Sequence, residues 1–267
     1  MSIDQEGGQV ARLNAGDGYA ATLSEAQVGA RDDLAATHAW AHTMATWLAG
    51  ARINLNFAPV VDLDVNPTSP AIGALGRSFS ADPAVVTALA SQAIRAHHQV
   101  GVRCAIKHFP GIGSSTGNTD AGFVDVTRTW HPVELAPFRS LVQAGWPDAV
   151  MVGHVLNGQL DASRPASLSH ATVTNLLRQG MGWRGVVVSD DMQAGAIRAR
   201  YGTAEAIGLA VEAGVDLLVF ANQAVYDPGV VATAVDAVAG LVRGGRVTIA
   251  ELRASADRRA RLLAGAV

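Results

Sequence analysis

Short apolar segments alternate with helical patterns along almost the whole chain, and this alternation limits the fold more than any other feature. The apolar segments are rich in Val, Ile and Leu and lie at 53–63, 102–109, 148–156, 185–192 and 215–222. Such continuous runs are typical of parallel strands covered on both faces. Helical patterns occupy 24–50, 82–99, 132–145, 169–180, 203–213, 229–242 and 249–264. The sequence therefore predicts an α/β fold with a parallel sheet.

The length of the chain fits one α/β barrel. A barrel of this kind takes about 250 residues, and the chain has 267. The sequence contains no linker, no repeat of fixed period and no low-complexity tract, so we predict one domain over residues 1–267. Helix starts are expected at Asp82-Pro83, Ser169 and Thr248, where capping side chains stand.

Nearly every apolar segment ends in polar or charged side chains: Asp62 and Asp64, Lys107 and His108, His154, Asp190 and Asp191, and Asn222. In an α/β barrel the carboxyl ends of the strands carry the active site. A doubly wound sheet also places its site there. The chain has no GxGxxG motif after a first strand and no phosphate loop, so a dinucleotide site is not predicted.

Charge and composition exclude several classes of partner. The net charge is −3 and there is no dense run of Lys or Arg, which argues against nucleic acid and anionic membranes. No apolar run approaches the ~18 residues of a membrane span, and no signal peptide is visible. Cys104 is the only cysteine, so no intrachain disulfide can form, and we expect it to be buried filler.

Each candidate residue has a functional and a structural interpretation. A carboxylate at the end of a buried strand is costly unless it is hydrogen-bonded or used, which favours chemistry for Asp190. Lys107 and His108 could hold a polar ligand or form a buried salt bridge. His154 could be a core histidine or a ligand contact, and Arg77 a solvated loop charge or a ligand contact.

The start of the chain adds further candidates. Asp4 and Glu6 precede Gly7-Gly8, which would let the backbone approach a ligand, although turn formation explains the same residues. The strand ends together offer carboxylates, histidines, a lysine and an arginine, without a Cys/His cluster for structural zinc. Such a set suits a neutral, polyhydroxylated substrate, and glycoside hydrolysis needs one carboxylate and a second acid or base.

Six motifs occur in an order that resembles glycoside hydrolase family 3. They are "DQEGGQVARL", "NFAPVVDLDVNP", "IGALGRSFSADP", "IKHFPGIGSSTGNTD", "AVMVGHV" and "GVVVSDDM". The similarity covers residues 3 to about 222 and is strongest to the single-domain β-N-acetylglucosaminidases.

The resemblance implies a (β/α)8 barrel and a retaining double displacement. Asp190 would be the nucleophile that forms a glycosyl-enzyme intermediate. Sugar-binding residues would be Asp4, Arg77, Lys107, His108, His154 and Met192. The substrates implied are terminal β-linked N-acetylglucosamine units from peptidoglycan or chitin, as in cell-wall recycling. No metal or organic cofactor is implied, and we expect a monomer in a bacterial cytoplasm.

One loop departs from the pattern of the family. Members commonly have His-Phe-Pro-Gly-His-Gly followed by an Asp-x-His pair whose histidine is the general acid/base. Here Ile112 stands in the place of the second histidine of His-Phe-Pro-Gly-His-Gly, and Asn118-Thr119-Asp120 replaces the Asp-x-His pair. We predict that Asp120 takes the acid/base role. Its ordinary pKa is near 3.9, so burial or a nearby anion would have to keep it protonated.

The N-terminus also differs, because the family barrel begins with a strand and helix before "DQEGG". We expect the barrel to lack this first unit, and a longer natural chain could be exported or lipid-anchored. Three other functions stay open: a sugar-binding homologue without turnover, a β-glucosidase or xylosidase of the same family, and a metal-dependent hydrolase using His108, His154 and Asp190. The glucosidase branch usually has Ser-Asp-Trp at the nucleophile and a second domain.

Overall fold

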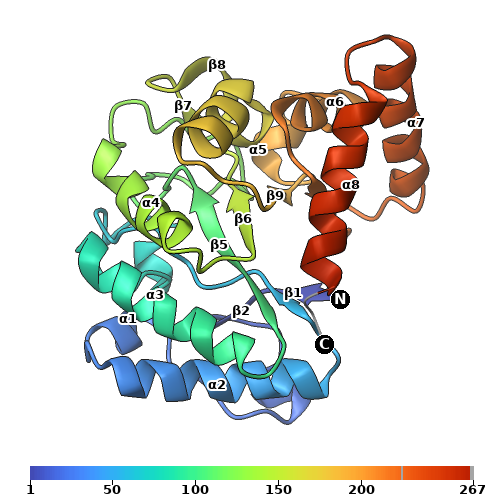
Figure 1. Ribbon diagram of the computed structural model, residues 1–267. Helices are drawn as coiled ribbons and strands as arrows, with labels where there is room; N and C mark the ends of the chain where they lie inside the picture. Colours follow the sequence, from blue (N-terminus) through green and yellow to red (C-terminus); the bar gives the residue numbers. More distant parts are fainter. Residues whose placement is uncertain (224, 265–267) are drawn as a thin grey trace.

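The computed structural model describes residues 1–223 and 225–264 (Figure 1). Its main sheet has six parallel strands in the order β1 (Ser2–Ile3), β4 (Leu55–Asn56), β5 (Arg103–Phe109), β6 (Ala149–Val152), β9 (Val186–Asp191) and β10 (Leu217–Val219). The five apolar segments predicted as strands each contain one of them. The α/β class and the parallel sheet are therefore confirmed.

The expected barrel, of the (β/α)8 type but lacking its first strand and helix, does not close within the residues that the structure describes. In residues 1–223 and 225–264 the sheet is a curled half-barrel with β1 and β10 at its edges. Closure requires the full number of strands at a matched tilt and stagger. The other strands instead form two separate antiparallel pairs, β2 (Gln5–Gly7) with β3 (Val10–Ala11) and β7 (Leu156–Asn157) with β8 (Asp161–Pro165).

Helices cover the outer face of the sheet. The α-helices are α1 (Glu25–Gly29), α2 (Leu34–Gly50), α3 (Pro83–His98), α4 (Ala136–Gln143), α5 (Gly195–Arg198), α6 (Thr203–Ala213), α7 (Val230–Arg243) and α8 (Ile249–Ala264). A π-helix, η5, spans Ala171–Gly180, and short 3₁₀ turns are η1 (Ala15–Asp17), η2 (Gly73–Leu75), η3 (Pro132–Leu135) and η4 (Ala166–Leu168). α2 packs on α3, and α3 packs on α4 and β5 (Figure 1).

The predicted helix 24–50 is interrupted. α1 ends at Gly29 and α2 begins at Leu34, after Asp33 accepts hydrogen bonds from the amides of Ala35 and Ala36. A capping side chain satisfies the free amides at a helix start, so Asp33 makes a second start inside the alanine-rich run.

Side chains at the other predicted helix starts accept the expected bonds. The Asp82 carboxylate accepts from the amide of Ala84 at 2.8 Å, and Ser169 Oγ accepts from the amide of Thr172 at 3.1 Å. Thr248 and Glu251 cap reciprocally, with distances of 3.2 Å and 2.7 Å. The capping predictions are confirmed.

The strands alternate between two apolar layers. Ala105, Met151 and Val188 point to a cluster on the inner face, whereas Ile106 and Val187 point to the cluster shared with the outer helices. This follows from the two-residue period of a strand. Cys104 is fully buried as predicted, and burial raises the pKa of its thiol. No helix within residues 1–223 and 225–264 is long and apolar enough to cross a membrane.

A buried carboxylate fastens α8 to the sheet. The Asp216 side chain is inaccessible to solvent and accepts hydrogen bonds from Arg178 Nη2 and Arg258 Nη2, each at 2.7 Å. It also accepts from the amide of Val187 at 2.9 Å. The end of α8 consequently lies beside the N-terminus (Figure 1).

We expect Asp216→Asn to lower the free energy of unfolding by about 2–4 kcal/mol, because removing one charge of a buried set leaves its partners uncompensated. Urea unfolding followed by circular dichroism measures the loss. The control is Glu212→Gln, which affects the ion pair with the exposed Arg246 and should cost less than about 1 kcal/mol. Equal losses in the two variants would contradict the anchoring role of Asp216.

Candidate functional site

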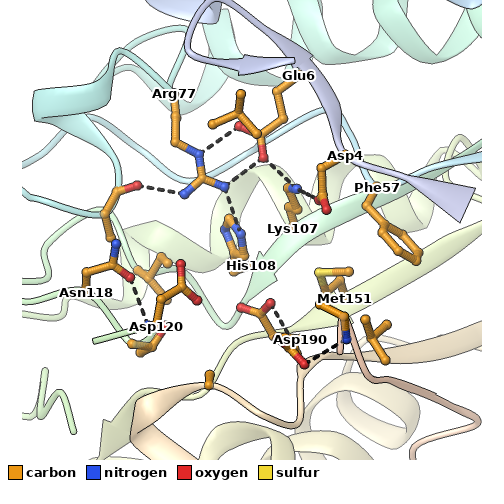
Figure 2. A pocket seen from close by; sticks show the side chains of 18 of the residues that line it. Asp4, Glu6, Phe57, Arg77, Lys107, His108, Asn118, Asp120, Met151 and Asp190 are labelled. Atoms are coloured by element: carbon orange, nitrogen blue, oxygen red, sulfur yellow. Dashed lines mark hydrogen bonds and ion pairs between the residues drawn. The ribbon is translucent and has the colours of Figure 1, made fainter. Parts of the chain in front are cut away.

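A polar cavity of about 330 Å³ opens at the carboxyl ends of the strands (Figure 2). Six of the predicted site residues line it: Asp4, Arg77, Lys107, His108, Asp120 and Asp190. They come from five separate segments of the chain, so the half-barrel brings together what the sequence keeps apart. A polar concave site at strand ends is the expected place for chemistry in this kind of fold.

Lys107 is a buried cation held between two carboxylates. Its Nζ lies 2.6 Å from Asp4 Oδ1 and also contacts Glu6 Oε1. Burial alone would lower the pKa of Lys107, but Asp4 and Glu6 raise it above its ordinary value. The ammonium therefore stays charged and fixed at the pocket wall.

Arg77 shares the same carboxylate. Its Nε and Nη2 donate to the two oxygens of Glu6, each at 2.7 Å, and its Nη1 donates to the carbonyl of Ala71 at 2.7 Å. Burial would raise the pKa of Glu6, yet Lys107 and Arg77 hold it well below its ordinary value. A bidentate pair fixes the plane of the guanidinium as well as its position. Of the two interpretations of Arg77, a solvated loop charge is therefore ruled out.

His108 is oriented by a buried aspartate. Asp62 Oδ2 lies 2.6 Å from Nδ1 of His108 and accepts from its amide at 3.1 Å. The other oxygen of Asp62 accepts from the amide of Ile112 at 2.8 Å. An Nδ1–H that donates to Asp62 leaves Nε2 of His108 facing the pocket, 3.3 Å from Nη2 of Arg77.

Asp190 is the second-to-last residue of β9 and lines the pocket. Its Oδ1 accepts from the amide of Asp191 at 2.8 Å. Burial would raise the pKa of Asp190, but His154, His108, the Asp191 amide and Lys107 together hold it below its ordinary value. Asp190 is therefore an anion over most of the pH range, as a nucleophile must be.

Asp120 faces Asp190 across the pocket (Figure 2). It lies on the loop after β5, and its amide donates to Asn118 Oδ1 at 2.9 Å. Partial burial and the charge of Asp190 raise the pKa of Asp120, against the opposing effects of His108 and Arg77. Burial and a nearby anion, the two effects expected from the sequence to favour a protonated aspartate here, both act on Asp120.

Two predicted substrate-binding residues do not line the pocket. His154 is buried, with Nδ1 2.7 Å from Ser167 Oγ and Nε2 2.9 Å from the carbonyl of Asp191. Both ring nitrogens are used, so His154 is a hydrogen-bonded core histidine behind the strand end. Met192 packs into the core, and its amide donates to the carbonyl of Val219 at 2.9 Å.

Some residues of the site were not predicted as site residues. Glu6 lines the pocket and joins Lys107 to Arg77. Asp62 is fully buried, does not line the pocket, and orients His108. Arg12 and Gln193 also line the pocket. The polar strand-end pattern contained the signal for Asp62 and Glu6, whereas nothing in the sequence marks Arg12 or Gln193.

Comparison with known proteins gives the family. The profile described as "Glycosyl hydrolase family 3 N terminal domain" matches residues 1–262. The chain belongs to glycosyl hydrolase family 3. The resemblance stated from the six motifs is therefore confirmed, and so is the enzyme class, a glycosidase.

Curated relatives have consistent names. The chain is 38% identical over 251 residues to "Beta-hexosaminidase" of Xylella fastidiosa (strain M23), which covers 90% of this chain and 70% of that protein. It is 34% identical over 235 residues to "Beta-hexosaminidase A" of Pseudoalteromonas piscicida, covering 81% of this chain and 39% of that protein.

Solved structures in the family superpose closely. A glycoside hydrolase family 3 β-N-acetylglucosaminidase from Paenibacillus sp. str. FPU-7 matches with a TM-score of 0.88 and 35% identity, over 99% of this chain and 49% of that chain. A β-N-acetylhexosaminidase from Beutenbergia cavernae DSM 12333 matches with a TM-score of 0.88 and 35% identity, over 98% of this chain and 77% of that chain. The chain thus spans about half of the Paenibacillus enzyme.

Proposed function

We propose that this glycosidase releases terminal β-linked N-acetylglucosamine with retention of configuration, using Asp190 as nucleophile and Asp120 as acid/base. The observation that carries the proposal is the pair of carboxyl groups facing each other with pKa values moved in opposite directions. Environments that separate two carboxyl pKa values assign one group to the acid role and the other to the anion role.

The reaction would proceed in two displacements. Asp190 attacks the anomeric carbon while Asp120 gives its proton to the glycosidic oxygen, so the aglycone leaves as a neutral alcohol. Water then attacks the glycosyl-aspartate. Asp120, now a carboxylate, takes a proton from that water, and Asp190 leaves as an anion.

The cations and the histidine would hold the sugar during both steps. Lys107 and Arg77 present donors along one wall, and Asp4 and Nε2 of His108 present acceptors at the same wall. Because Glu6 and Asp62 fix these side chains before substrate arrives, little side-chain ordering is left to binding. The names of the relatives support the N-acetyl sugar over glucose or xylose. Peptidoglycan or chitin fragments are the proposed source, and the single domain over 1–267 stays a prediction.

Release of p-nitrophenol from p-nitrophenyl β-N-acetylglucosaminide and from the β-glucoside tests the proposal. We expect a clear preference for the N-acetyl substrate. Preference for the glucoside would support the other branch of the family. Binding of N-acetylglucosamine without turnover of either substrate would support a sugar-binding homologue and contradict the enzymatic proposal.

The pH profile should have an alkaline limb that belongs to Asp120. The acid must carry a proton when the glycosidic bond breaks, so kcat/KM falls as pH rises through the raised pKa of Asp120. Asp190 must be an anion, and its lowered pKa places the acid limb below the ordinary titration range of an aspartate. Phenyl β-N-acetylglucosaminide should show the alkaline limb, and the 2,4-dinitrophenyl glycoside, which needs no acid, should not. The same limb with both substrates would contradict the assignment.

A further inference from the structure

The loop that carries Asp120 is fastened where it leaves β5 and where it returns. Ser115 Oγ lies 2.9 Å from Ser69 Oγ, and the carbonyl of Ser115 accepts from Asn66 Nδ2 at 2.9 Å. On the returning side, the guanidinium carbon of Arg200 lies 3.4 Å from the ring centroid of Phe123. These contacts hold both arms of the loop and thereby contribute to the position of its tip.

The tip rests on the segment that follows the nucleophile. The carbonyls of Asp120 and Thr119 accept hydrogen bonds from the amides of Gly195 and Ala196, each at 2.9 Å. Gly195 stands only five positions after Asp190. The backbone on which the proposed acid is mounted is therefore bonded directly to the first turn of α5.

The segment between Asp190 and Gly195 is itself rigidly held. The Asp191 carboxylate accepts from the amides of Gln193 at 3.0 Å and Ala221 at 3.1 Å. The amide of Met192 donates to Val219 on β10 at 2.9 Å. The loop tip consequently takes its position from the same framework that positions Asp190.

Gly195 permits this contact because it has no Cβ. A Cβ at Gly195 would lie 2.6 Å from both the carbonyl carbon and the oxygen of Ala121, and 2.8 Å from the oxygen of Asp120. The backbone of Gly195 is not in the left-handed region, so alanine can adopt its conformation. The obstacle to a Cβ at this position is the steric clash with the loop. Any side chain at this position must displace the loop tip.

We infer that Gly195 is a positioning residue that sets the place of the Asp120 carboxyl opposite Asp190. The inference rests on the proposed acid/base role of Asp120. It adds the backbone contact with Gly195 that holds Asp120 in its place. An acid displaced by about 1 Å loses much of its effect, whereas the nucleophile on its separately held strand end keeps its place.

Gly195→Ala is tested with two aryl β-N-acetylglucosaminides of different leaving-group acidity. We expect kcat/KM for the phenyl glycoside to fall about 10- to 100-fold, within the usual contribution of a general acid. The 2,4-dinitrophenyl glycoside, which leaves without a proton, should change by less than about 3-fold on the same ground. The control is Gly202→Ala, since a Cβ there meets nothing within 4 Å, and both of its rates should match wild type.

A second variant tests the inference independently, in case Gly195→Ala does not fold. Arg200→Gln removes the cation over Phe123 on an exposed side chain and should give the same selective loss in weaker form. Equal losses with both substrates in Gly195→Ala, or no loss, would overturn the inference. Asp120→Asn is assayed beside it. If Asp120→Asn does not lose more activity with the phenyl than with the dinitrophenyl glycoside, the acid/base proposal fails, and so does this inference. If Asp120→Asn shows that difference and Gly195→Ala does not, only the positioning role of Gly195 fails.

Discussion

Asp190→Asn should lower kcat/KM for p-nitrophenyl β-N-acetylglucosaminide by at least about 10⁴-fold, the scale seen when a nucleophile is removed. Asn keeps the shape and one oxygen to accept from the Asp191 amide, so the pocket should remain intact. An amide cannot form the glycosyl ester, and the first displacement is then lost. Retained binding of N-acetylglucosamine by the variant, measured by calorimetry, would separate lost chemistry from lost structure.

Small anions provide a positive test of the same role. In Asp190→Gly, azide can enter the space of the missing carboxylate and attack the anomeric carbon from the same side. The expected product from an activated substrate is the α-glycosyl azide, identified by NMR. Recovery of only the β-azide, or more than about one hundredth of wild-type turnover in Asp190→Asn, would contradict the assignment.

Asp120→Asn should divide substrates by their leaving groups. Loss of a general acid costs about 10²- to 10⁴-fold, and this loss should appear with the phenyl glycoside. With the 2,4-dinitrophenyl glycoside bond cleavage needs no proton, and a burst of dinitrophenol should persist while release of the sugar slows. The slow second step follows because no carboxylate remains to take a proton from water.

The matched control is Asp125→Asn, a carboxylate on the returning arm of the same loop that is hydrogen-bonded to Thr127. Both substrates should react as with wild type. If the burst disappears in Asp120→Asn, or if phenyl and dinitrophenyl rates fall in parallel, another group supplies the proton.

Local pattern was enough to predict the strands, the helix starts and the polar strand ends. Lys107 and His108 lie near the end of β5, and Asp190 lies near the end of β9. These positions were predictable because a buried strand usually ends where an apolar run turns polar. Pairwise contacts depend on strand order and were not predictable. Arg77 and Glu6 are 71 positions apart, and their contact depends on how distant segments of the chain are brought together by the fold.

Other differences come from competition between local and distant interactions. The break between α1 and α2 was not predicted, because the alanine-rich pattern continues on both sides of it. Gly29 and Asp33 nevertheless stand where one helix ends and the next is capped. His154 could not be assigned from sequence, because whether its nitrogens meet Ser167 and Asp191 or a ligand depends on where η4 and the end of β9 lie. The place of Asp120 depends on a backbone contact with Gly195 that no side-chain pattern marks.

The sharing of Glu6 between Lys107 and Arg77 has a consequence for how substrate reaches the site. Each cation already has its counter-charge within the wall, so little electric field extends into solvent to steer a ligand. A neutral saccharide would arrive by unguided diffusion, and its recognition would begin only on contact. Selection would then rest on how many hydroxyl groups fit the fixed donors and acceptors, and would vary little with ionic strength.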